Sequence, residues 1–158
     1  MDNIYPILAI DYGKKHFGLS ISDNKGIIAS PLEVLSITKN RNIKIIIQEI
    51  SEICKEYNIK SILIGQPQVF SENQNRSKKN IDHFSRLIKE NTNIPILFQD
   101  ESFSTTEAQN MLRFSGQNIK NTRNKIDKIA ATVFLQEFLN SKKKRKWKIT
   151  TYLKCPWL

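Results

Sequence analysis

Residues 4–23 read IYPILAIDYGKKHFGLSISD. Residues 4–11 are almost all apolar, as in a strand that is buried on both faces. Residues 17–22 alternate apolar with small or polar side chains, which is typical of a half-buried strand. Asn24-Lys25-Gly26 then supplies a turn into a third strand near residues 27–29. We therefore expect the chain to open with three antiparallel strands.

Helices and strands alternate in the next part of the chain. Residues 40–58 place isoleucines at helical spacing, and Asn58 suits a left-handed helix stop. Residues 61–65 predict a short buried strand, and residues 94–99 predict another after a helix through residues 81–88. A strand, a crossover helix and a strand indicate a parallel, right-handed unit. The pattern predicts an α/β fold whose mixed central sheet has three antiparallel strands, then parallel ones, and is flanked by helices.

Three further segments have weaker or shorter patterns. Residues 66–79 lack an apolar period and are expected to form a mobile loop. Residues 104–107, STTE, match a capping box that starts a helix ending near Gly116. Residues 126–138 carry the apolar spacing of a final core helix.

The composition changes after Asn140. Residues 142–148 read KKKRKWK, and more aromatic side chains follow. Interleaved basic and aromatic residues suit phosphate neutralisation and base stacking, although the aromatic rings of such a tail can instead pack on their own domain. We expect a single domain over residues 1–140 and a basic aromatic tail over residues 141–158.

The overall composition is that of a cytosolic domain. The 158 residues suit one compact core, with 39% hydrophobic and 25% charged residues and no stretch of the kind that crosses a membrane. The first residues lack the basic and apolar regions of a secretion signal. Cys54 and Cys155 are too few for a disulfide framework or a zinc cage, which fits a reducing cytosol.

The chain is strongly basic. Its 25 Lys and Arg exceed its 15 Asp and Glu, giving a formal net charge of +10. This charge favours a polyanionic partner, of which nucleic acid is the commonest. Richness in Lys, Asn and Ile is also what an AT-rich genome produces, so the charge alone leaves both explanations open.

Acidic residues stand at the ends of predicted elements. Asp11 ends the first strand, Asp100-Glu101 ends the strand over residues 94–99, and Asp127 opens the last helix. An unpaired buried carboxylate is costly, so such groups usually find a partner or bind a metal. Three that converge would form a cage of oxygen ligands for Mg²⁺ or Mn²⁺. Strand ends and helix caps on a solvated rim are the structural alternative.

The predicted topology gives these acids a common place. Strand one is expected in the middle of the sheet beside the fourth strand, so the carboxyl ends of these two strands lie side by side, at the edge where Asp11 and Asp100-Glu101 are expected. Ligand sites of open sheets form outside such ends. The small side chains of Ala130 and Ala131, one turn after Asp127, would let the last helix lie close against the sheet.

Four motifs resemble one family. Residues 10–23, IDYGKKHFGLSISD, resemble the opening signature of the YqgF/RuvX family, bacterial proteins of the RNase H-like fold that are related to RuvC-type resolvases. Residues 64–67, IGQP, resemble its Gly-Leu-Pro segment, and residues 100–105, DESFST, its Asp-Glu-Arg-hydrophobic-Ser/Thr-Thr motif. Residues 126–131, IDKIAA, resemble its Val-Asp-x-x-Ala-Ala helix start. The resemblance covers about residues 4–140 and implies an endonuclease that matures the 5′ end of pre-16S rRNA, with Holliday-junction resolution as the older proposal.

The resemblance also implies site residues. Asp11, Glu101 and Asp127 would be the catalytic ligands of one or two Mg²⁺ or Mn²⁺ ions. Strand alternation prevents Asp100 and Glu101 from both pointing into one site. A glutamate is expected there in RuvC-like enzymes, so Glu101 is the prediction and Asp100 the alternative.

Basic residues are expected to contact the nucleic acid. Lys15 matches a basic position of the opening motif, while Ser102 replaces the arginine that usually follows the acidic pair. The missing charge has four candidate substitutes, which are Lys14, Arg76, Lys78 and Arg123. The expected substrate is pre-rRNA, with branched DNA as the alternative and the small ribosomal subunit as a further partner.

Two other functions fit parts of the sequence. Asp11-Tyr12-Gly13 also resembles the phosphate-binding turn of actin-like ATPases, but those enzymes close two such domains around ATP, and this chain has the length of one. A non-catalytic RNA-binding factor in ribosome assembly is the stronger rival, because Ser102 stands in place of the arginine.

Overall fold

A computed structural model of the protein describes residues 3–66, 72–100 and 123–151. In chain order the elements are β1 (Ile7–Tyr12), β2 (His16–Ser22), β3 (Ala29–Ser36), α1 (Ile43–Glu56), β4 (Ser61–Gln66), α2 (Glu72–Asn91), β5 (Ile96–Asp100) and α4 (Arg123–Thr151). The predicted helix after residue 104 and its stop at Gly116 lie outside the described residues.

The five strands form one mixed sheet in the order β3-β2-β1-β4-β5. β1 pairs antiparallel with β2, and β2 pairs antiparallel with β3. β4 pairs parallel with both β1 and β5. The mixed sheet and the central place of β1 beside β4 are therefore confirmed.

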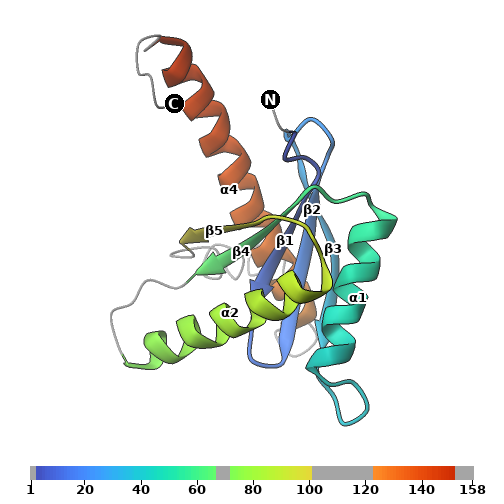
Figure 1. The fold of residues 1–158 in the computed structure, drawn as a ribbon. Helices are drawn as coiled ribbons and strands as arrows, with labels where there is room; N and C mark the ends of the chain where they lie inside the picture. Colours follow the sequence, from blue (N-terminus) through green and yellow to red (C-terminus); the bar gives the residue numbers. More distant parts are fainter. Residues whose placement is uncertain (1–2, 67–71, 101–122, 152–158) are drawn as a thin grey trace.

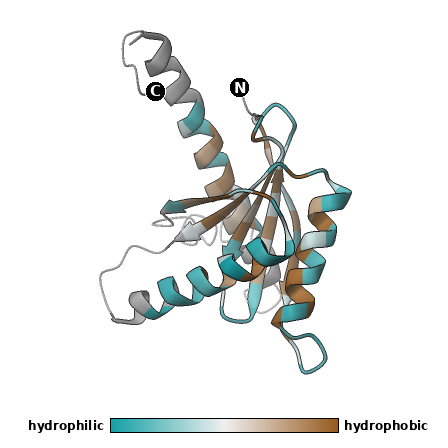
Figure 2. Cartoon of the chain, viewed as in Figure 1, coloured by the Kyte–Doolittle hydropathy of each residue, from teal (hydrophilic) through white to brown (hydrophobic). Residues whose placement is uncertain are grey.

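Alternation along β1 divides the hydrophobic core into two layers. Leu8 and Ile10 belong to a cluster with α1 and α2, whereas Ile7 and Ala9 belong to a second cluster with α4. Figure 1 shows α1 and α2 on one side of the sheet and α4 crossing the other. Figure 2 shows the apolar strands between these layers, with hydrophilic residues along the visible face of α2. Both faces of the sheet are covered, as the continuous apolar run of β1 predicts.

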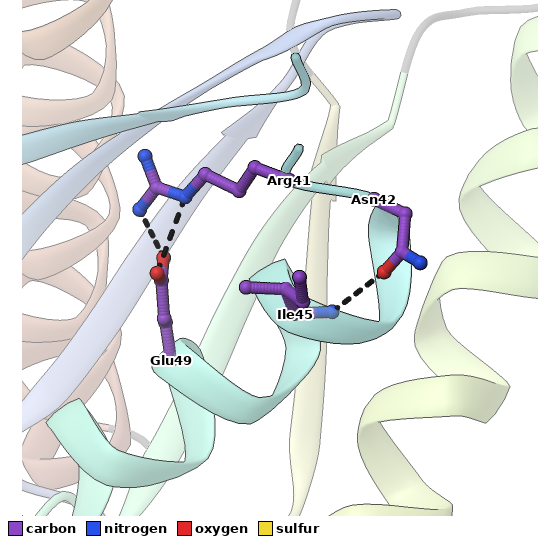
Figure 3. A network of polar contacts seen from close by, with 4 residues as sticks. All are labelled: Arg41, Asn42, Ile45 and Glu49. Carbon is purple, nitrogen blue, oxygen red and sulfur yellow. Dashed lines mark hydrogen bonds and ion pairs between the residues drawn. The ribbon is translucent and has the colours of Figure 1, made fainter. Parts of the chain in front are cut away.

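The helix α1 begins three residues later than predicted and ends close to its predicted stop. Its N-cap residue Asn42 accepts a hydrogen bond from the backbone N–H of Ile45 at 3.1 Å (Figure 3). Its inward face is made of buried isoleucines and Cys54. Asn58, just beyond the helix, has φ of 53°, which confirms the predicted left-handed stop.

The helix α4 lies close against the sheet. Ala130 and Ala131 are buried, and the backbone O of Ala131 accepts a hydrogen bond from Ser20 Oγ at 2.9 Å. Further along, Gln136 accepts from the N–H of Ala29 and donates to the backbone O of Ile27, at 2.9 Å in each case. The predicted close approach through small side chains is confirmed.

Three boundaries differ most from the sequence prediction. The third strand is β3 (Ala29–Ser36) rather than residues 27–29, because Asp23 Oδ1 accepts from the N–H groups of Ile27 and Ile28 and holds them in the turn. The predicted loop over residues 66–79 is helical from Glu72, since apolar spacing marks only the buried part of a helix. For the same reason α4 continues to Thr151 instead of ending at residue 138.

The length of α4 affects the predicted boundary between the domain and its C-terminal tail. The helix passes Asn140 without a break and projects beyond the sheet (Figure 1). The side chains after Lys142 lie outside the described residues, so the division at residue 140 stays a prediction. In the described part of the chain, no helix is long and apolar enough to cross a membrane.

Candidate functional site

Asp11 lies at the carboxyl end of β1, on the side of the sheet that α4 covers. Ile7 and Ala9 pack with α4, and Asp11 is the next residue of the same row. Tyr12 belongs to the opposite row, where its ring lies 5.4 Å from Phe17 and 5.1 Å from Phe84. Asp11 is half-buried.

Two glycines flank Asp11 across the sheet. Gly18 of β2 pairs directly with Asp11. On the other side Ile10 pairs with Ile64, so Gly65 of β4 is the neighbour one residue further on. Because neither glycine carries a side chain, the strands next to Asp11 leave room around its carboxylate on the α4 side.

The register of α4 brings its first turn level with Asp11. Ser20, which contacts Ala131, is the strand partner of Ala9. Gln136 lies five residues later in α4 and bonds to Ala29, the partner of Ser22, so α4 runs antiparallel to β1. Asp127 precedes Ala131 by four residues, or about 6 Å of helix, and Asp11 follows Ala9 by two residues, or about 7 Å of strand. The backbone of Asp127 therefore lies at the height of Asp11, while its side chain is outside the described residues.

β5 brings a third position to this edge of the sheet. Gly65 pairs with Gln99 and Gln66 pairs with Asp100, the last residue of β5. Leu97 packs with the α4 cluster, so Gln99, two residues on, belongs to the same face as Asp11. The backbone position of Asp100 belongs to the other row, with Ile96 and Phe98. Glu101 lies outside the described residues.

Gln99 is a polar residue on the Asp11 face of the sheet that was not predicted from the sequence. Its Oε1 is buried, and within the described structure it has no hydrogen-bond partner. Buried polar atoms are nearly always paired, so one without a partner needs an explanation. The sequence shows only a polar residue at the end of an apolar strand. Its relation to Asp11 becomes visible once the β4–β5 register is known.

The hairpin between β1 and β2 carries basic residues beside Asp11. A Cβ at Gly13 would lie 2.5 Å from the backbone O of His16, so only glycine fits this tight turn. Lys14 and Lys15 are exposed at the tip. The backbone O of Lys15 accepts from the N–H of Ile37 at 2.8 Å, which joins the hairpin to the end of β3.

More basic residues follow β3 at the same edge. The segment from Ile37 to Asn42 leads into α1, and in it Lys39 is exposed. Arg41 forms an ion pair with Glu49 of α1, and its Nε donates to Glu49 Oε1 at 3.2 Å (Figure 3). Lys44 is exposed in the first turn of α1. These cations were not predicted to lie at this edge, because the third strand was expected to end near residue 29, well before the segment that carries them.

The other residues that were predicted to contact nucleic acid belong to α2 and α4. Arg76 and Lys78 are exposed on α2, which follows the carboxyl end of β4. Arg123 is the first residue of α4, and its side chain is outside the described residues. Of the predicted nucleic-acid contacts, Lys14 and Lys15 are thus the two that the described structure brings to the edge of Asp11.

The two histidines and the described cysteine differ in their surroundings. His16 Nδ1 and Ser36 Oγ share a hydrogen bond of 2.8 Å, and His83 is exposed on α2. Burial raises the pKa of the Cys54 thiol to about 11. In residues 3–66, 72–100 and 123–151, wherever side chains are described, no three His, Cys, Asp and Glu gather as a metal cluster. Asp11 is the predicted metal ligand whose side chain is described.

Solved structures share this arrangement of strands and helices. The chain superposes on Thermus thermophilus RuvC bound to a Holliday junction substrate with a TM-score of 0.56, 14% identity, and coverage of 87% of this chain and 95% of that one. For the fowlpox virus resolvase in complex with Holliday junction DNA, the TM-score is 0.51, with 17% identity and coverage of 86% and 97%. At such low identity the likeness shows the fold, which is the RNase H-like fold of RuvC-type resolvases.

Other proteins have a higher sequence identity to this chain. The protein of Mesomycoplasma hyopneumoniae (strain 7448) called "Putative pre-16S rRNA nuclease" is 36% identical over 137 residues, covering 87% of this chain and 95% of its own length. A Dictyoglomus turgidum protein of the same name is 35% identical over 135 residues, covering 85% and 94%. The family model described as "RuvX: Holliday junction resolvase" matches residues 5–141. From this match and these relatives, the chain belongs to the RuvX family.

Proposed function

We propose that this protein is a metal-dependent endonuclease that processes the 5′ end of pre-16S rRNA. The observation that carries the proposal is the position of Asp11, between two glycines at the carboxyl edge of the sheet and level with the first turn of α4. The names of the relatives in the RuvX family support the same reaction.

The donor atoms at this edge suit a hard cation. The Asp11 carboxylate supplies oxygen donors on the α4 side of the sheet, and Mg²⁺ and Mn²⁺ prefer such ligands. We infer that Asp11, Glu101 and Asp127 hold one or two of these ions. Asp100 fits less well, because its backbone position belongs to the other row of β5. When bound, the ions would activate water and stabilise negative charge on the scissile phosphate.

The protein's own residues fix the geometry and the charge of the site. β1 is paired on both sides, so Asp11 is held on an interior strand of the sheet. Lys14 and Lys15 would neutralise phosphates that flank the scissile bond. No side-chain nucleophile is needed. Cys54 is unsuited to that role, because its buried thiol stays protonated at neutral pH.

The first test is cleavage by Asp11→Asn. Wild type should cut a labelled pre-16S rRNA 5′ leader only when Mg²⁺ or Mn²⁺ is present, and Asp11→Asn should lose at least about a hundredfold in rate. Asp82→Asn, which changes a half-buried acid on α2, is the matched control and should cut normally. Full activity of Asp11→Asn would refute the proposed site.

A four-way DNA junction assayed in parallel separates the candidate activities. Preference for the leader supports rRNA maturation, and preference for the junction supports resolution, the activity in the description of the family model. The second candidate is a non-catalytic RNA-binding factor, which Ser102 in place of the usual arginine favours. Tight binding of the leader without metal-dependent cutting would select it, and we would then examine binding to the small ribosomal subunit.

A further inference from the structure

Two turns that carry exposed lysines are joined at the edge of the sheet where β1 ends. One is the β1–β2 hairpin with Lys14 and Lys15, and the other is the turn before α1 with Lys39. The backbone O of Lys15 accepts a hydrogen bond from the N–H of Ile37 at 2.8 Å, which connects the two. Figure 1 shows both turns near the bottom of the view, on the side of β3, the edge strand opposite β5.

The turn before α1 is held by its own contacts. The N–H of Thr38 donates to the O of Arg41 at 3.0 Å, and the N–H of Arg41 donates to the O of Thr38 at 3.2 Å. The Arg41 side chain forms an ion pair with Glu49 of α1 (Figure 3). These bonds order the backbone that carries Lys39. A side chain on an ordered backbone loses less conformational freedom when it binds a partner.

The two turns and the start of α1 carry charge of one sign. Residues 12–18 and 36–48 contain five Lys and Arg and no Asp or Glu, so no acid within these segments offsets their charge. Four of the five are exposed, and no ion pair of the described residues involves them. These four side chains, which we call the basic surface, are Lys14, Lys15, Lys39 and Lys44. Concentrated positive charge of this kind suits a polyanion.

Lys44 does not stabilise the helix on which it stands. It lies in the first turn of α1, which contains no acidic residue. The helix dipole favours acidic side chains near the N-terminus and disfavours cations there. A lysine at this position is therefore better explained by an external partner than by the folding of α1.

The position of the basic surface selects a flexible ligand. Asp11 belongs to the row of β1 that faces α4, whereas α1 covers the opposite face of the sheet. A nucleic acid that reaches both must bend around the β1–β2 hairpin. Duplex DNA is stiff over about 150 base pairs, so a sharp bend is costly for a duplex but not for a single strand.

We propose that Lys39 and Lys44 bind the phosphate backbone of a single-stranded RNA whose scissile phosphate lies at Asp11. This inference rests on the proposed function and adds the path of the RNA, which leaves the site over the β1–β2 hairpin and crosses the end of β3 toward α1. Lysines that contact phosphates do not read bases, so this surface accepts single strands regardless of their sequence.

The test measures binding of a labelled oligouridylate to the full chain, without divalent metal and from low to physiological salt. Lys39→Ala/Lys44→Ala should reduce the slope of log K against log salt by about 1.4, or about 0.7 for each lost phosphate contact. The matched control is Lys55→Ala/Lys60→Ala, which removes the same charge from the last turn of α1 and from the residue just before β4. It should keep the wild-type slope.

The variant Lys39→Arg/Lys44→Arg retains both charges and should also keep the wild-type slope. An unchanged slope for the folded Lys39→Ala/Lys44→Ala protein would refute the contact and leave the surface to an acidic protein partner. Equal losses in both Ala double variants would refute it as well, because a diffuse field does not depend on position. Should the Ala variant fail to fold, Lys39→Gln/Lys44→Gln is measured in its place.

Cleavage of the pre-16S rRNA leader with Mn²⁺, assayed in parallel, separates this inference from the proposed function. A wild-type protein that shows the predicted slopes but does not cut contradicts the nuclease and leaves the RNA contact in place. A wild-type protein that cuts, while the Lys39→Ala/Lys44→Ala slope is unchanged, supports the nuclease and overturns the contact. Failure of the wild type to bind oligouridylate would overturn the contact too.

Discussion

Tyr12 and Asp11 are neighbours in the chain that serve opposite faces of the sheet. The Tyr12 ring packs against Phe17 and Phe84, and the Phe17 and Phe84 rings are stacked with centroids 5.1 Å apart. Burial also raises the pKa of the Tyr12 hydroxyl. Rotating the end of β1 would pull Tyr12 out of these contacts. The aromatic packing on one face therefore fixes the direction of the carboxylate on the other.

Cys54 gives a prediction about stability and pH. Its pKa is raised to about 11 by burial, from 9.0 when exposed, so the unfolded chain loses this proton first as pH rises. The contribution of the Cys54 thiol to the free energy of unfolding is therefore complete below about pH 9 and decreases between about pH 9 and pH 11. In this pH range the folded state binds more protons than the unfolded state. A two-unit shift corresponds to about 2–3 kcal/mol in the free energy of unfolding.

The comparison that isolates Cys54 is urea unfolding of wild type and Cys54→Ala at pH 8 and pH 10. Other groups titrate in both proteins, so the informative quantity is the difference between their pH dependences. Wild type should lose more stability between the two pH values than Cys54→Ala. Parallel losses would mean that the thiol is not protected in the folded state.

At the scale of elements, the contact between α4 and the sheet sets the distance from Asp127 to Asp11. Ala131 is fully buried where α4 crosses β2, next to Ser20. Ala131→Leu would force α4 away from the sheet and should lower the free energy of unfolding by about 1–3 kcal/mol. Because the first turn of α4 moves with it, Mn²⁺ affinity and cleavage should fall together.

The control for this substitution is Asn140→Leu, which adds the same side chain at an exposed position of α4. It should leave Mn²⁺ affinity and cleavage close to those of wild type. Urea unfolding and calorimetry on both variants test the prediction. Wild-type Mn²⁺ binding by a folded Ala131→Leu protein would show that the spacing of α4 does not control the site.

Elements were predictable where the sequence carries a strong period. Three patterns predict buried side chains, namely the apolar run of β1, the isoleucines of α1 and the alanines of α4. The structure buries all three sets. The start of α2 and the end of α4 were missed, because solvent-exposed turns need no apolar spacing. β3 was misplaced because the hydrogen bonds of Asp23, rather than hydrophobicity, define its preceding turn.

At the scale of the whole molecule, the sequence indicated the acids of the site but not all of its neighbours. Asp11 could be singled out because a carboxylate at the end of a buried strand is unusual. Gln99 and Lys39 could not, since their relation to Asp11 depends on strand register and on where β3 ends. The roles of Glu101, Asp100 and Asp127 remain predictions that metal binding by their Asn and Gln variants will test.

The net charge of +10 is useful to a nuclease only if cations lie where the substrate binds. Lys14 and Lys15 lie at the Asp11 edge of the sheet, while Lys25 and Lys60 are exposed at the opposite edge, in the turn after β2 and just before β4. The double variant Lys14→Ala/Lys15→Ala should weaken binding of the single-stranded rRNA leader. Each lost phosphate contact should reduce the slope of log K against log salt by about 0.7.

The matched control is Lys25→Ala/Lys60→Ala, which removes the same net charge from the far edge. Binding titrations of both double variants and wild type, from low to physiological salt, give the three slopes. A loss of about 1.4 in the slope for the first double variant alone would place the RNA backbone beside Asp11. Equal losses in both double variants would instead mean that the charge acts as a diffuse field, because a localised contact depends on position while net charge does not.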